Sequence, residues 1–78
     1  MWSQGMIAYP KTGEMYKYWV KHFEEGSEYG IDGGRISKLT IHSVDGDREV
    51  CNYDRGWDVE PATDEVKKVY AILLEKYN

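Results

Sequence analysis

The stretch that decides the fold is Met-Tyr-Lys-Tyr-Trp-Val-Lys-His-Phe, residues 15–23. Successive side chains of a β-strand point to opposite faces, so this stretch divides into two sets. One face carries Tyr16, Tyr18, Val20 and His22, and the other carries Met15, Lys17, Trp19, Lys21 and Phe23. Both sets contain aromatic rings. One face can supply a core, so Trp19 on the other face is open to water unless something covers it.

Length and composition limit the kind of protein. The chain has 78 residues and a net charge of −4, which predicts one small domain over residues 1–78 and disfavours general binding to duplex nucleic acid. Cys51 is the only cysteine, so an internal disulfide is excluded and a reducing, cytoplasmic setting is expected. The start does not resemble a signal peptide, no apolar run is long enough for a membrane span, and no membrane partner is expected. Self-association into a homodimer would help so short a chain to be stable.

Three further strands are predicted around residues 15–23. Residues 6–9 form a short first strand, residues 35–44 a third and residues 49–53 a fourth. A bulge near Ser37 would bring Ile36 onto the same face as Leu39 and Ile41. Residues 24–34 contain four glycines and predict a loop, with Tyr29 and Ile31 as candidate plugs, and residues 45–47, Asp-Gly-Asp, predict a hairpin turn.

A C-terminal helix is the clearest element. Its apolar stripe follows the spacing of one helix face and consists of Val66, Val69, Tyr70, Leu73 and Tyr77. Thr63 or Glu60 would cap its start. The predicted fold is therefore α+β, an antiparallel meander of three to four strands with one C-terminal helix packed on one face.

A single helix covers only one face of such a sheet. If it covers the side of Tyr16, the opposite face shows Lys17, Trp19, Lys21, Lys38, Thr40, His42, Val50 and Asn52. Three interpretations of this face stay open. The lysine stems shield the Trp19 ring, the face binds a protein or a second copy, or it binds single-stranded nucleic acid.

Signals for catalysis or metal binding are weak. His22 and His42 are predicted on different faces, and their spacing to Cys51 matches no zinc pattern. Cys51 has no cationic neighbour in sequence, which favours a small buried hydrophobe. The glycines of residues 24–34 precede a strand and lack the Gly-Lys-Ser/Thr of a phosphate loop. We expect no catalytic residue, no metal and no cofactor.

Arginine and tryptophan lie together in residues 53–58, Tyr-Asp-Arg-Gly-Trp-Asp. Arg55 beside Trp57 is typical of an interaction hot spot, and Arg35 is expected nearby. The alternative is structural, with Asp54 and Asp58 pairing with the arginines and Trp57 packed under the start of the helix.

Two stretches, residues 27–39 and residues 52–58, resemble a family of small uncharacterised proteins of Gram-positive bacteria and their phages and mobile elements. The resemblance runs from about Met15 to the C-terminus. It implies a small accessory protein, of a kind that often binds a host protein or blocks a defence system. It implies no activity, cofactor or catalytic residue.

Together these observations predict a non-enzymatic protein-binding accessory or inhibitor protein. Its predicted partner contacts are Trp19, Tyr29, Arg35, Arg55 and Trp57. The alternative function is binding of single-stranded nucleic acid by Lys17, Trp19, Lys21 and Lys38.

Overall fold

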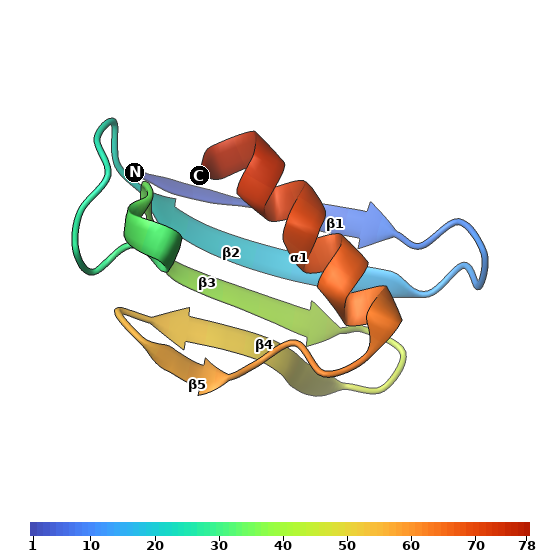
Figure 1. Ribbon diagram of the computed structural model, residues 1–78. Coiled ribbons are helices and arrows are strands. Elements are labelled where there is room, and N and C mark those ends of the chain that lie inside the picture. The colour runs from blue at the N-terminus through green and yellow to red at the C-terminus, as the bar shows by residue number, and fades with distance from the viewer.

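A computed structural model describes all 78 residues and shows a five-stranded antiparallel sheet with one helix across one of its faces (Figure 1). The strands follow one another in sheet order as a meander. Their bounds are β1 (Trp2–Ala8), β2 (Met15–His22), β3 (Ile36–Ser43), β4 (Arg48–Asp54) and β5 (Trp57–Val59), and the helix is α1 (Asp64–Tyr77). The α+β class, the antiparallel meander and the C-terminal helix are confirmed, but the sheet has five strands rather than three or four.

The first strand is longer than predicted. Residues 6–9 were expected to form it, whereas β1 begins at Trp2 and pairs with β2 along its whole length, from Trp2 opposite Lys21 to Ala8 opposite Met15. Ser3, Gln4 and Gly5 are weak strand formers, so this order comes from pairing with β2 rather than from local preference. Gly5 has a steric role, because a Cβ there would lie 2.7 Å from the Tyr18 hydroxyl.

The short strand β5 was not predicted at all. Residues 54–56, which were expected to end the sheet, form a turn, and Trp57 then pairs back with Tyr53. Arg55 adopts a positive φ of 58° in this turn. At the other hairpin, residues 45–47 form the expected turn, although the positive φ falls on Asp47 and not on the glycine.

Two bulges decide which side chains reach the core. The register between β2 and β3 shifts from Lys21 opposite Lys38 to His22 opposite Ile36, which makes Ser37 the extra residue and confirms the predicted bulge. Ile36 is fully buried as a result. A second shift, between β3 and β4, leaves Val50 as the extra residue, and Val50 packs against the core. Its predicted place on the opposite face was wrong, because a bulge breaks the alternation of side chains.

The core lies between α1 and the sheet. The helix contributes Val66, Val69 and Leu73, and the sheet contributes residues from β2, β3 and β4 that include Val20, Leu39, Ile41 and Cys51. Thr63 caps the helix by accepting a hydrogen bond from the Val66 amide at 3.1 Å, as one of the two predicted caps. This helix of 14 residues is not long and apolar enough to cross a membrane.

The glycine-rich loop, residues 24–34, is tied to the end of the helix by Asn78. The Asn78 side chain accepts a hydrogen bond from the Ile36 amide at 3.0 Å and donates one to the Ile31 carbonyl at 3.1 Å. A Cβ on Gly34 would lie within 2.5 Å of this side chain, so any other residue there would displace the Asn78 amide. Ile31 is buried and plugs the core as predicted, whereas Tyr29 stays about half exposed.

We therefore expect Asn78→Ala to destabilise the protein by about 1–3 kcal/mol, because two backbone groups next to the core lose their partners. Urea unfolding followed by circular dichroism measures this change. The control Glu75→Ala, on the exposed face of α1, should stay within about 0.5 kcal/mol of the wild type. Equal stability of Asn78→Ala and wild type would show that Asn78 does not tie the loop to the helix.

Candidate functional site

The sheet face turned away from α1, called here the open face, is the candidate site. Hydrogen-bonded registers place its side chains in three rows that cross β1, β2, β3 and β4 in order. These rows are Trp2–Lys21–Lys38–Asp54, Gln4–Trp19–Thr40–Asn52 and Met6–Lys17–His42–Glu49. The central claim from the sequence, that Trp19 lies on a side the helix does not cover, agrees with this arrangement.

Large apolar side chains on this face stay in contact with water. Trp2 is 59% exposed, Met6 50%, Trp19 38% and Phe23, just after β2, 48%. Such a grouping is unusual for a solvated surface and marks interaction sites. Trp2 was missed from the sequence, because residues 2–5 were not assigned to a strand.

The cation–π contacts of Lys21 are made with rings other than Trp19. The Lys21 ammonium lies 5.9 Å from the Trp2 ring centroid and 5.6 Å from that of Phe23. Two shallow hollows instead flank Trp19, one lined by Gln4, Met6 and Lys17 and the other by Trp2 and Gln4. The indole is thus accessible from both sides along β1.

Charge changes across the open face from β1 to β4. The β1 column, Trp2, Gln4 and Met6, is uncharged. The β2 column brings two lysines, whereas Asp54 and Glu49 lie on β4. Asp54 forms a salt bridge with Lys38 at 3.7 Å, and Glu49 accepts a hydrogen bond from Asn52 at 2.8 Å. The positive charge is therefore concentrated on β2.

Three of the other predicted partner residues meet at the β4–β5 turn. The Arg55 guanidinium lies 4.3 Å from the Tyr29 ring centroid, and the Tyr53 hydroxyl donates to the Tyr29 carbonyl at 2.9 Å. The Trp57 ring contacts Tyr53 and Tyr70 edge-on at 5.1 and 5.5 Å. Trp57 therefore packs against the middle of α1 rather than its start, on the helix side of the sheet.

Arg35 does not join that cluster. Its Nε donates to the Asn78 backbone oxygen at 3.3 Å, at the end of α1. The five predicted partner residues thus occupy three places, with Trp19 alone on the open face. The backbones of the two segments do meet, since the Arg55 amide donates to the Ser37 carbonyl at 3.0 Å, two residues after Arg35. The Arg35 side chain contacts the helix terminus, whereas that of Arg55 lies on the Tyr29 ring.

The two histidines lie on opposite sides of the sheet, as predicted. His22 packs on the Tyr77 ring at 4.8 Å, and its Nε2 lies 2.9 Å from the Ser3 hydroxyl. Burial, with the positive charges of the amino terminus and Arg35, lowers the pKa of His22. His42 instead pairs with Asp47 at 3.3 Å. Cys51 is fully buried, and burial raises the pKa of its thiol to about 12.

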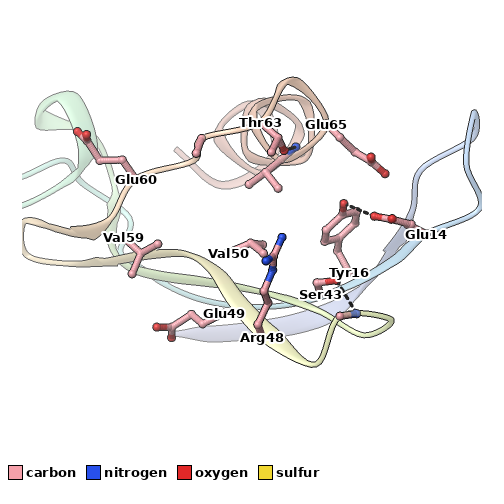
Figure 2. A pocket seen from close by; sticks show the side chains of 13 residues that line it. Glu14, Tyr16, Ser43, Arg48, Glu49, Val50, Val59, Glu60, Thr63 and Glu65 are labelled. Atoms are coloured by element: carbon pink, nitrogen blue, oxygen red, sulfur yellow. Dashed lines mark hydrogen bonds between the residues drawn. The ribbon is translucent and has the colours of Figure 1, made fainter.

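A groove of about 520 Å³ lies on the helix side, between the start of α1 and the β3–β4 hairpin (Figure 2). Tyr16 donates a hydrogen bond to Glu14 at 2.7 Å at one end, and Arg48 points toward the helix from β4. The lining carries four glutamates, among them Glu60 and Glu65, and one arginine, and it contains no histidine or cysteine. No three His, Cys, Asp or Glu side chains in the structure are arranged to hold a metal ion.

Comparison with known protein families matches a domain of unknown function over residues 1–78, the whole chain. The chain belongs to the DUF7678 family. The expected membership of an uncharacterised family is confirmed. Searches among curated proteins and among solved structures found no match. For this DUF7678 chain, the geometry of the open face is therefore the main guide to function.

The lowered pKa of His22 gives a testable pH dependence in this DUF7678 domain. Unfolded His22 takes up a proton near pH 6.5, whereas the folded form does so only at lower pH. Its contribution to stability is therefore complete above pH 6.5 and is lost as the pH falls through the folded pKa. We expect the wild type to lose more stability than His22→Gln between pH 7.5 and pH 5.5, measured by urea unfolding.

The control is Thr40→Ser, a change on the other face that keeps both histidines and should keep the wild-type pH dependence. An equal loss in wild type and His22→Gln would contradict the assignment, since the titrating group would then lie elsewhere.

Proposed function

We propose that this protein is a non-enzymatic, cytoplasmic binding module whose open face docks onto another protein. The observation that carries the proposal is the group of exposed apolar side chains, Trp2, Met6, Trp19 and Phe23, on a face without a covering element. Tryptophan is enriched among the hot-spot residues of protein interfaces, and two hollows beside Trp19 offer room for a partner's side chains.

The charge pattern suggests the chemistry of the partner. Lys17 and Lys21 flank Trp19 on β2, in a chain whose net charge is −4. A partner surface with an apolar centre and an acidic rim would complement this part of the face. Arg55, Tyr29 and Trp57 would form a separate, secondary contact, because they lie at the β4–β5 turn and not beside Trp19.

Binding of single-stranded nucleic acid is the second candidate. Aromatic rings and three lysines on one sheet face are the features that favour it. Several contacts weigh against it. Lys38 is already paired with Asp54, Lys21 lies against two rings, and Glu49 and Asp54 would face the phosphates. A protein partner is therefore the better candidate.

The resemblance to proteins of phages and mobile elements of Gram-positive bacteria suggests the biological setting. In that setting the partner would be a host protein, and the outcome would be inhibition, for instance of a defence system. This part of the proposal rests on the resemblance alone.

The test compares binding by three proteins, namely wild type, Trp19→Ala and Ile72→Ala. Ile72 is a matched control, because it is an apolar residue 49% exposed on the outer side of α1. A partner is captured from cells that encode the protein, purified and titrated by calorimetry. Trp19→Ala should weaken binding at least tenfold while leaving the thermal unfolding temperature nearly unchanged. Ile72→Ala should bind like the wild type.

Two results would reject a protein partner on the open face. One is equal affinity of Trp19→Ala and wild type for the captured protein. The other is tight binding of labelled single-stranded oligonucleotides at low salt that is lost in Lys17→Glu and falls steeply with added salt, which would establish the second candidate.

A further inference from the structure

Strand β1 is an edge of the sheet whose outer backbone groups have no partner strand (Figure 1). Met1 accepts a hydrogen bond from the His22 amide, and the Tyr9 amide donates to Glu14, so odd-numbered residues of β1 bond to β2. In an antiparallel pair the residues that bond to one neighbour alternate with residues that face the other side. The N–H and C=O groups of Trp2, Gln4, Met6 and Ala8 therefore point outward.

This edge lacks the features that normally prevent strand pairing. Natural edge strands are protected by charges, prolines, bulges or shortness. Residues 2–8 contain no charged residue and no proline, and the seven residues pair with β2 without a register shift. The other edge, β5, has three residues with Asp58 in the middle and follows a register shift. Of the two edge strands, only β1 lacks these protecting features and can accept another strand along its length.

We propose that β1 pairs antiparallel with β1 of a second copy of this chain, with Gly5 on the two-fold axis. In this register Trp2 bonds to Ala8 of the second copy, and Gln4 bonds to Met6 of the second copy. All outward groups of both strands then pair, which gives about eight backbone hydrogen bonds. Sliding the strands by two residues would leave outward groups unpaired at both ends.

The side chains support a second copy as the occupant. The β1 column is the apolar, uncharged end of the open face, so pairing there buries part of Trp2 and Met6 against Ala8 and Gln4 of the second copy. The lysines on β2 of the two copies would be separated by three strand spacings, at least about 14 Å, which is beyond the screening length of about 8 Å. Stacking two open faces would instead bring these lysines together. Pairing also suits a 78-residue chain that cannot form an internal disulfide.

The primary test compares wild type, Gln4→Pro and Gln4→Thr by sedimentation equilibrium. The wild type should reach twice the chain mass of 9.1 kDa as its concentration rises. Gln4→Pro removes an outward N–H and keeps the bonds to β2, so it should weaken dimerisation at least tenfold and remain folded. Gln4→Thr alters the same side chain, keeps the N–H and should dimerise like the wild type.

A cross-linking experiment keeps the proposal falsifiable if Gln4→Pro does not fold. Three samples are oxidised in parallel: chains carrying Gln4→Cys alone, chains carrying Met6→Cys alone, and an equal mixture of the two. Residue 4 of one chain faces residue 6 of the other across the proposed interface, with about 5.5 Å between Cα atoms, which is within disulfide range. Residue 4 of one chain lies about 7–8 Å from residue 4 of the other. The mixture should therefore cross-link faster than either chain alone. Cys51 is buried and should not compete.

A wild type that stays monomeric to millimolar concentration would overturn the proposal. So would a dimer that a folded Gln4→Pro leaves intact, or equal cross-linking in the mixed and separate samples. The proposal does not rest on the binding of another protein by Trp19, since these measurements use the purified chain alone.

Discussion

The structure depends on the contact between one stripe of α1 and one face of the sheet. Val66, Val69 and Leu73 are the buried residues of the helix, and they pack on a sheet surface that is itself fully buried beneath them. Each such side chain contributes about 1.5–3 kcal/mol on burial, so the contact outweighs any single polar interaction in so small a domain. A sheet has two faces and this chain has one helix. The open face is therefore a direct consequence of the same contact that stabilises the fold.

Sequence periodicity predicted the parts of the fold in which burial is regular. The alternation through residues 15–23 placed Tyr16 and Val20 in the core and Trp19 outside it, and the helical spacing from Val66 onward placed the buried stripe. Simple alternation places Ile36 on the face opposite Leu39 and Ile41. This mismatch predicted the bulge at Ser37, because an apolar residue on the wrong face signals a break in alternation. These predictions succeeded because local pattern and tertiary burial agree at these positions.

The rest depended on contacts that no local pattern reports. Trp2 lies in a strand because residues 2–8 pair with β2, although Gly5 and Gln4 do not favour a strand. Simple alternation along β4 predicts that Val50 lies on the open face, but the second bulge directs it toward the core. The long-range bonds of Asn78, which fix the glycine-rich loop, connect residues more than 40 positions apart. The candidate site was found only in part for this reason, with Trp19 recognised and the apolar column of β1 missed.

The position of Trp19 relative to β1 determines whether the two proposed interactions compete. Trp19 lies one strand inside the edge, opposite Gln4, and its ring is reached from the face of the sheet and not from its edge. Backbone pairing at β1 runs in the plane of the sheet, perpendicular to that direction of approach. A second copy joined at the edge would therefore leave both Trp19 indoles open on one continuous face, about 16 Å apart. Self-pairing would enlarge the binding surface, and a partner would meet two tryptophan anchors where the single chain offers one.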